Sequence, residues 1–251
     1  MAVETPGALV GSGRNADVYD VGDRRVLRRY RDGRDARLVE AEAQVMVQAR
    51  AFGVPVPEVF DVSGADIVME RATGPTMLDA IGRRPWTVRA QAALLARLHE
   101  LVHQIPASGL LELVQRIPPP FGSVESSPQD SDVLLHRDLH PQNVILTASG
   151  PMIIDWEGAA RGPAIADVAM TWVIIGFSDV PGSRLRAIAA LGVQSAFTRA
   201  FARFAGPIDQ ATRLTAIRAR LADPNLLPSE AARLEKLAPT PEPVDISAEG
   251  A

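Results

Sequence analysis

The chain has 251 residues, 47% of them hydrophobic, and a formal net charge of −4, which suits a globular protein with one large domain or two lobes. The negative charge gives no basic field to hold nucleic acid, and the absence of cysteine excludes disulfides and thiolate metal sites. No segment has the features of a signal peptide or a membrane span, so we expect a cytoplasmic protein without nucleic-acid or membrane partners. Nothing in the pattern indicates an oligomeric state.

The first seventy residues predict a small β-rich lobe. In residues 8–30, apolar positions alternate and glycines interrupt the pattern, which predicts three strands joined by tight turns. Residues 35–52 have helical spacing and stop before Gly53, which predicts a helix that ends there. The segment DIVME, residues 66–70, predicts a short buried strand.

Beyond Arg71 the pattern is mainly helical. A helix is predicted over residues 89–103, with an apolar stripe formed by Leu94, Leu98, Leu101 and Val102. Two short apolar runs, residues 143–147 and 151–155, flank the turn ASG. This arrangement predicts a β-hairpin.

Amphipathic helices are predicted to continue to about Leu237. The Pro-rich acidic end, residues 239–251, is predicted to be disordered. We therefore expect an α+β protein with a two-lobed, protein-kinase-like architecture. Residues 1–70 would form a small β-rich N-lobe and residues 71–238 a larger α-helical C-lobe.

A polar cluster stands at the entrance of the predicted hairpin, in HRDLHPQNVIL, residues 136–146. Asp138 and Asn143 have the spacing of His-x-Asp-x-x-x-x-Asn, and Asp155 follows twelve residues after Asn143. Phosphoryl transfer to an alcohol needs one carboxylate that orients the alcohol and accepts its proton, and oxygen ligands that hold Mg²⁺ against the triphosphate. Asp138 fits the first requirement, and Asn143 and Asp155 fit the second.

Two other interpretations remain open from the residues alone. His136, Asp138 and His140 could bind zinc, since imidazole and carboxylate groups are zinc ligands, but this leaves Asn143 and Asp155 without a role. Alternatively, the segment is a polar turn whose histidine is buried and hydrogen-bonded.

A glycine turn near the N-terminus predicts a phosphate-covering loop. Gly11, Ser12 and Gly13 fall between two predicted strands, where glycines let backbone N–H groups approach phosphate. A Walker-type P-loop is excluded, because the only lysine, Lys236, lacks the required glycines.

An arginine and a glutamate are predicted to form an ion pair in the small lobe. Arg28 has the same strand parity as Val26, so both side chains are expected on the buried face. Glu42 lies within the apolar face of the helix that Val39 and Met46 define. A carboxylate in that position needs a partner, and we predict that Arg28 provides it.

Together these segments resemble the aminoglycoside phosphotransferase family, small-molecule kinases with a protein-kinase-like fold. The resemblance rests on HRDLHPQNVIL, IIDWEGAARGPAIADVA, VGSGRNADVY and VPVPEVFD, and covers roughly residues 7–170. It implies that Asp138 is the catalytic base and that Asn143 and Asp155 are magnesium ligands. It also implies support of the site by His136, His140 and Asp167, and an adenine site at Met69, Glu70 and Ala72.

The resulting hypothesis is a Mg²⁺-dependent kinase that uses ATP, with GTP as the alternative nucleotide, and acts on a hydroxyl of a small molecule. Arg28 stands where the family usually has lysine, so a catalytically impaired nucleotide-binding protein on the same fold is the second hypothesis. From Thr171 to Ala238 nine basic and five acidic residues give a charge of +4. This balance disfavours a polycationic aminoglycoside as acceptor.

Overall fold

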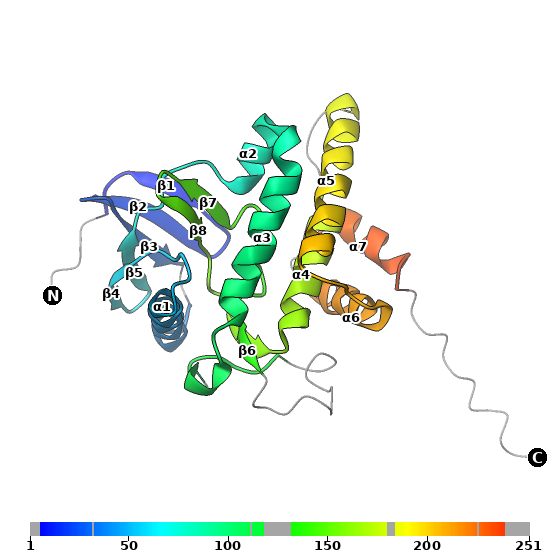
Figure 1. The fold of residues 1–251 in the computed structure, drawn as a ribbon. Helices are drawn as coiled ribbons and strands as arrows, with labels where there is room; N and C mark the ends of the chain where they lie inside the picture. Colours follow the sequence, from blue (N-terminus) through cyan, green and yellow to red (C-terminus); the bar gives the residue numbers. More distant parts are fainter. Residues whose placement is uncertain are drawn as a thin grey trace, which may run out of the picture.

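The computed structural model describes residues 6–31, 33–110, 112–117, 132–179, 184–224 and 226–238, with the backbone alone for residues 184–189. A sheet-containing lobe lies beside a lobe built mainly of helices (Figure 1). The predicted two-lobed α+β fold is confirmed. The predicted disordered tail, residues 239–251, lies outside the described residues.

The N-lobe contains a five-stranded antiparallel sheet in the order β1-β2-β3-β5-β4. Its strands are β1 (Leu9–Ser12), β2 (Ala16–Gly22), β3 (Arg25–Tyr30), β4 (Val59–Ser63) and β5 (Asp66–Glu70). The predicted strands in residues 8–30 and at residues 66–70 are confirmed. The sequence did not predict β4, because Pro55 and Pro57 precede it and a bulge near Asp61 breaks its alternation.

Helix α1 (Ala36–Ala51) packs on the sheet through β4 and β5. Its N-cap, Asp35, accepts the N–H of Arg37, and its end is followed by Gly53 with φ +84°, a left-handed conformation that glycine adopts readily. The predicted helix and its stop are therefore confirmed. Its buried side chains are Val39, Glu42, Ala43, Val45, Met46 and Ala49.

Residues 71–76 connect the lobes and run beside a hairpin of the C-lobe. The N–H of Leu146 donates to the carbonyl of Pro75 at 2.9 Å, and Thr76 forms a bridge with Ile145. The hairpin is the one predicted from its two apolar runs. Its strands are β7 (Val144–Thr147) and β8 (Gly150–Ile153), and helix α2 (Met77–Arg83) follows the connecting segment.

The helices of the C-lobe pack mainly as two pairs, α3 with α5 and α4 with α6 (Figure 1). The remaining elements are η1 (Pro85–Thr87), α3 (Val88–His103), η2 (Ala107–Leu110), β6 (Val133–Leu135), β9 (Ala160–Gly162), α4 (Ala164–Phe177), α5 (Arg184–Phe204), α6 (Gln210–Leu221) and α7 (Pro228–Glu235). Strands β6 and β9 pair with each other and frame the segment that carries the polar cluster.

The predicted stripe of α3 is only partly correct. Leu98 and Val102 are buried, but Leu94 and Leu101 are half-buried at the edge of the packed face. His99, a polar residue that an apolar pattern leaves out, lies within that face and is 1% exposed. The buried face is therefore rotated from the one predicted, because a hydrogen-bonded histidine takes a core position.

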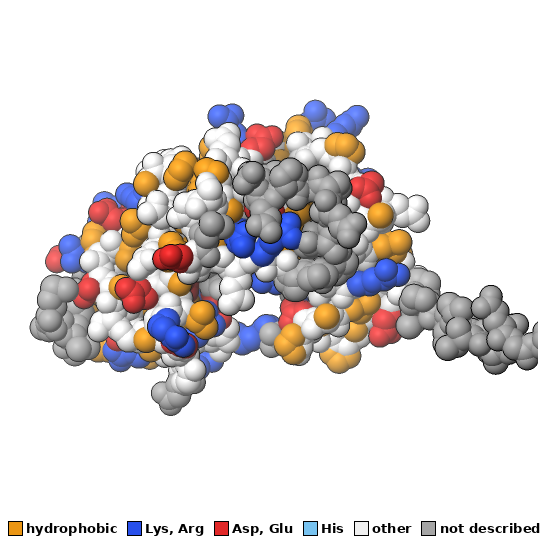
Figure 2. Space-filling model, turned by 90° about the horizontal axis from the view of Figure 1, so that it is seen from below, with side chains coloured by type: hydrophobic (Ala, Val, Ile, Leu, Met, Phe, Trp, Pro, Cys, Tyr) orange, Lys and Arg blue, Asp and Glu red, His pale blue; other side chains and the backbone are white. Residues whose placement is uncertain are grey.

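One apolar core runs through both lobes, from Ala16 in β2 to Ala238 after α7. It includes Trp156 and Phe201, which are the largest fully buried side chains among the residues that the structure describes. On the face shown in Figure 2, acidic and basic side chains are interspersed with apolar ones. Among the helices of the described ranges, none has both the length and the apolar character needed to cross a bilayer.

Candidate active site

The loop between β6 and β7 places Asp138 against Asn143 and His140. Asn143 Nδ2 donates to Asp138 Oδ2 at 3.0 Å and to the Asp138 carbonyl at 2.8 Å, and His140 Nε2 lies 3.4 Å from Asp138 Oδ1. Burial alone would raise the pKa of Asp138, but hydrogen bonding from His140 and Asn143 and the nearby imidazoles lower it below its usual value. The carboxylate is therefore ionised at neutral pH and can accept a hydrogen bond from an alcohol.

The β7–β8 hairpin brings Asp155 beside Asn143. The N–H of Ile154 donates to the Asn143 carbonyl at 3.0 Å, and Asp155 is the next residue. Asp155 has φ +67°, a left-handed conformation that aspartate tolerates better than most residues, and its side chain is 41% exposed. Because Asn143 uses its amide N–H groups on Asp138, its Oδ1 is the atom left to accept a ligand.

Arg28 on β3 joins the two lobes. Its Nη1 lies 2.9 Å from Glu42 Oε1 and its Nη2 lies 2.6 Å from Asp155 Oδ1. The predicted Arg28–Glu42 ion pair is confirmed, with 12% and 2% of the two side chains exposed. Burial would lower the pKa of Arg28, but Glu42, Tyr30 and Asp155 beside it raise the pKa, so the group stays charged.

Two contacts of this ion pair were missed by sequence reasoning. The bond from Arg28 to Asp155 links residues 127 positions apart, which no local pattern can reveal. The Tyr30 hydroxyl also donates to Glu42 Oε2. The strand parity that Tyr30 shares with Arg28 was the available signal for this second contact.

Asp167, in the first turn of α4, holds the backbone of the loop between β6 and β7. Its Oδ2 accepts the N–H of His136 at 3.1 Å and its Oδ1 accepts the N–H of Arg137 at 2.6 Å. Arg137 has φ +69°, and these charge-assisted bonds stabilise that uncommon conformation. Burial would raise the pKa of Asp167, but the hydrogen bond and charge of His103 lower it well below its usual value.

Two histidines of α3, which the sequence analysis left without a role, complete this support. His103 Nε2 donates to Asp167 Oδ2 at 3.1 Å. His99 Nε2 lies 3.0 Å from Thr171 Oγ1, and that hydroxyl donates to the carbonyl of Leu139 in the loop at 3.0 Å. The loop is therefore fastened at two points to the packed helices α3 and α4.

The zinc interpretation of the loop is wrong. Both ring nitrogens of His136 are already hydrogen-bonded, because Nδ1 accepts the N–H of Asp138 at 3.3 Å and Nε2 donates to the carbonyl of Ile154 at 3.1 Å. Within the described part of the chain, no three His, Asp or Glu side chains are grouped to hold a metal. His136 itself is buried against Trp156, and burial lowers its pKa, so it is neutral. The polar-turn interpretation describes His136 correctly but not the network around Asp138.

The glycine turn differs from the prediction in one respect. Gly11 and Ser12 belong to β1 itself, and only Gly13 lies in the turn. The Gly13 N–H donates to the Ala16 carbonyl at 2.8 Å, and Ser12 Oγ donates to Asp17 Oδ1 at 2.6 Å. The expected phosphate contact of these residues stays a prediction.

Glu157, which sequence reasoning missed, fastens the N-lobe to the C-lobe. Its Oε1 accepts Asn15 Nδ2 at 2.8 Å and lies 2.6 Å from Arg34 Nη1. Its Oε2 lies 3.8 Å from Arg28 Nη2. The available signal was its position two residues after Asp155, in the segment IIDWEGAARGPAIADVA.

The residues expected to meet adenine lie where the sheet passes into the linker. Met69 is 9% exposed and pairs with Val26, and the Glu70 N–H donates to the Glu58 carbonyl at 2.8 Å. Ala72 is half-buried in the linker. Their contact with a nucleotide stays a prediction.

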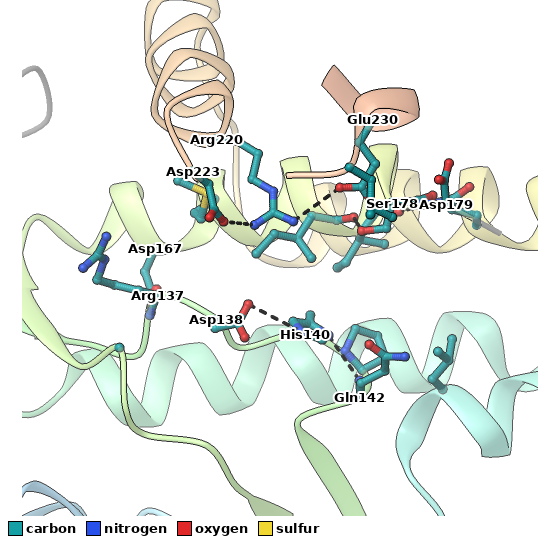
Figure 3. Close-up of a pocket in the computed structure, with 18 of the residues that line it drawn as sticks. Arg137, Asp138, His140, Gln142, Asp167, Ser178, Asp179, Arg220, Asp223 and Glu230 are labelled. Atoms are coloured by element: carbon teal, nitrogen blue, oxygen red, sulfur yellow. Dashed lines mark hydrogen bonds and ion pairs between the residues drawn. The ribbon is translucent and has the colours of Figure 1, made fainter. Parts of the chain in front are cut away.

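A cavity of about 1450 Å³ lies beside Asp138, between the loop that joins β6 to β7 and the helices α4 to α7. In Figure 3, Asp138 and His140 lie along one side of the cavity, and Arg220, Asp223 and Glu230 lie along the other. Typical small-molecule pockets measure about 300–1,000 Å³. The cavity therefore has room for a small molecule next to the Asp138 carboxylate.

Comparison with known proteins gives the family of the chain. A profile of the phosphotransferase enzyme family matches residues 7–113 and 110–205. Thiamine kinases of Salmonella paratyphi B and Salmonella newport are 44% identical over 39 residues, which is 16% of this chain. The match spans only 14% of the length of those kinases.

Solved structures share the fold at low sequence identity. The gentamicin complex of APH(2")-IIa has a TM-score of 0.59 and 13% identity, covering 86% of this chain and 80% of that one. The amicoumacin kinase hAmiN has a TM-score of 0.55 and 14% identity, and the match covers 92% of this chain and 86% of that one. A choline/ethanolamine kinase family protein from Mesorhizobium loti has a TM-score of 0.54 and 19% identity, and the match covers 95% of this chain and 90% of that one. Since the family profile matches most of its length, the chain belongs to the phosphotransferase enzyme family, as its resemblance to aminoglycoside phosphotransferases implied.

Proposed function

We propose that the protein is a kinase that transfers the γ-phosphate of ATP to a hydroxyl group of a small molecule and depends on Mg²⁺. The observation that carries this proposal is the arrangement of three oxygen-bearing side chains. Asp138 and Asn143 are hydrogen-bonded to each other at the edge of a large cavity, and Asp155 lies beside Asn143 at the end of the neighbouring strand.

Asp138 would orient the acceptor hydroxyl and receive its proton. Its lowered pKa makes it a weak base, which suits phosphoryl transfer, because the loose transition state needs a correctly placed alcohol more than a strong base. Asn143 and His140 hold the carboxylate by hydrogen bonds, so its orientation is fixed before the acceptor binds.

The residues around Asp155 fit a divalent cation. Asn143 Oδ1 and the half-exposed Asp155 carboxylate are hard oxygen donors, which Mg²⁺ prefers, and both would hold it. When bound, the ion supplies charge neutralisation at the phosphate oxygens. Arg28, which stays cationic and lies against Asp155, would add a planar guanidinium for the same phosphates.

The names of similar proteins support a small-molecule acceptor and an adenine nucleotide. They describe a thiamine kinase, an amicoumacin kinase and a choline/ethanolamine kinase family protein, and the amicoumacin kinase was solved with AMP-PNP and Ca²⁺. For this chain, ATP remains the first choice and GTP the alternative.

The first test removes a proposed metal ligand. We expect Asp155→Ala to lower kcat by about 1,000-fold, because transition-state charge loses its neutralisation. Release of ADP in the presence of Mg²⁺, ATP and a panel of alcohols measures this. Asp61→Ala on β4 is the matched control and should keep full activity. Full activity of Asp155→Ala would contradict the metal role.

The second test separates a kinase from an impaired nucleotide-binding protein. Mg²⁺ and ATP at about 100 times the dissociation constant should stabilise either protein by about 2.7 kcal/mol in a thermal-shift experiment. Only a kinase also releases ADP in an acceptor-dependent manner. Stabilisation without turnover for any acceptor would favour the binding protein.

A further inference from the structure

The walls of the cavity beside Asp138 are mainly apolar. Helices α4 and α5 contribute Ile174, Ile175, Val193 and Phe197 to them. Ile174 and Ile175 expose 7% and 8% of their surface, and Phe197 exposes 3%. A molecule that binds there gains free energy by removing its own carbon surface from water, at about 25 cal/mol per Å². These walls favour an acceptor with an apolar body.

The charged side chains of the wall opposite Asp138 bond to one another. Arg220 lies between two carboxylates, with Nη1 2.7 Å from Asp223 Oδ2 and Nη2 3.4 Å from Glu230 Oε2 (Figure 3). Glu230 Oε1 also accepts the N–H of Asp179 at 3.0 Å. Because both signs of charge are paired within the wall, an ionic acceptor would have to break these bonds to gain partners.

The other carboxylates of the lining also have protein partners. Asp179 Oδ1 lies 2.6 Å from Arg233 Nη2, and Asp167 is held by the loop backbone and His103. A polycation loses the hydration of its ammonium groups on entry and needs unpaired carboxylates to offset that cost. Of the lining carboxylates that the structure describes, Asp138 is the one held only by Asn143 and His140, so few carboxylate oxygens are left for a polycation and the cavity is poorly suited to an aminoglycoside.

The described lining of the cavity also offers little to an acceptor with a single charge. Quaternary ammonium groups are recognised by several aromatic faces, but Phe197 is the one phenyl, phenol or indole ring among the lining residues that the structure describes. Arg14, Arg137 and Arg218 belong to the lining but are exposed, so water screens any attraction for an anionic acceptor.

We propose that the acceptor is an uncharged alcohol whose carbon skeleton is predominantly apolar; this inference rests on the proposed kinase function. The apolar walls of α4 and α5 hold the skeleton, and the hydroxyl lies against Asp138 on the opposite side. The Asp138 carboxylate receives the hydroxyl proton, the alcohol oxygen forms the bond to the γ-phosphorus, and the bond from that phosphorus to the bridging oxygen breaks to release ADP.

A homologous series of alcohols tests the inference on the intact protein. Transfer of labelled γ-phosphate from Mg²⁺-ATP is measured with 1-butanol, 1-hexanol and 1-octanol, and with kanamycin and choline for comparison. We expect kcat/KM to rise about fourfold for each added methylene, or about fifteenfold from butanol to hexanol. Both cationic acceptors should be poorer than hexanol.

A matched pair of variants on α5 locates the effect in the cavity. Val193→Asp places a charge on the lining and should lower kcat/KM for 1-octanol about tenfold, with the dissociation constant of Mg²⁺-ATP unchanged. Leu191→Asp makes a comparable change on the same helix, at a side chain that is 48% exposed, and should behave as the wild type. Thermal melting of both variants checks that they fold.

The outcomes separate the two proposals. Rates that do not depend on chain length, a preference for kanamycin or choline, or Mg²⁺-ATP binding without transfer to any of the alcohols would each overturn the acceptor class. Failure of the wild type to bind Mg²⁺-ATP, measured by calorimetry, would overturn the kinase function itself. The alcohol series measured with the wild-type protein tests the acceptor class even if Val193→Asp does not fold.

Discussion

Arg28 stands between two carboxylates, one buried and one half-exposed. Glu42 has 2% of its side chain exposed, so its charge depends on Arg28 and on the Tyr30 hydroxyl for compensation, whereas Asp155 is open to solvent. A lysine ammonium is a compact point charge and bridges two separated carboxylates less well than a planar guanidinium. The arginine therefore serves the fold as well as the site.

Removing one partner of this ion pair should destabilise the protein strongly. We expect Arg28→Met to lower the free energy of unfolding by about 3–5 kcal/mol, because Glu42 is left buried without its cation. Urea unfolding measures this. The double variant Arg28→Met, Glu42→Met should recover most of the loss, since an apolar pair needs no compensation. Equal destabilisation in both variants would show that the charge is not the cause.

His99 should make stability depend on pH. Burial lowers its pKa from 6.5 to about 4. Between pH 6.5 and 4 the unfolded chain binds a proton that the folded protein does not, so the free energy of unfolding falls as the pH is lowered through this window. The full effect is about 3 kcal/mol. Urea unfolding of the wild type and His99→Gln at pH 7, 5.5 and 4.5 should show a smaller slope in the variant, and identical slopes would refute the assignment.

His103 should act on catalysis through Asp167 and the loop backbone. We expect His103→Ala to lower kcat by about 10-fold to 100-fold with little change in the KM for ATP, because the loop that carries Asp138 loses a restraint. His103→Gln keeps an N–H donor and should restore most of the rate. Equal kcat values for His103→Ala and His103→Gln, or an effect on the KM for ATP alone, would argue against this positioning role.

At the level of elements, the linker after β5 packs directly on the C-lobe hairpin. A Cβ on Gly74 would collide with the backbone carbonyl of Leu146, so this approach requires glycine. The next residues continue the contact, with the Leu146 N–H bonded to Pro75 and the Leu78 N–H bonded to Pro141 at 3.0 Å. The start of α2 is thereby fixed to the loop that carries Asp138.

Adding a methyl group at this contact should be costly. We expect Gly74→Ala to lower the free energy of unfolding by about 1–3 kcal/mol, because two backbone segments must separate. Gly192→Ala in α5 is the control: nothing lies within 4 Å of its added Cβ, and alanine favours the helix by about 0.5–1 kcal/mol. Chemical unfolding measures both variants. An unchanged free energy of unfolding in Gly74→Ala would mean that the linker can move away from the hairpin at little cost.

Elements with a local signal were predictable, and contacts between distant segments were not. The spacing of Asp138 and Asn143 and the apolar setting of Glu42 are properties of short windows, so the loop and the ion pair could be inferred before the fold was known. The support by His99 and His103 depends on α3 packing against α4, which no window contains. The rotated face of α3 has the same origin, because His99 finds its partner only in the assembled lobe.

For the whole molecule, the family resemblance predicted the two-lobed order but not which side chains line the cavity beside Asp138. The net charge of the C-terminal helices suggested that a polycation would bind poorly. Our proposal for the acceptor rests on a more specific observation, which is that Arg220 and its two carboxylates bond to one another inside the wall. Charge counted along the sequence cannot distinguish such internal pairs from charges available to a ligand.

The links from the N-lobe to residues 155–157 have a consequence for turnover. Asn15, Arg28 and Arg34 all bond to Asp155 or Glu157, so a movement that separates the two lobes must break several charge-assisted bonds together. Dissolved salt weakens such bonds where they reach solvent. For the proposed kinase, a higher ionic strength would therefore speed any separation of the lobes that releases ADP, independently of the chemistry proposed at Asp138.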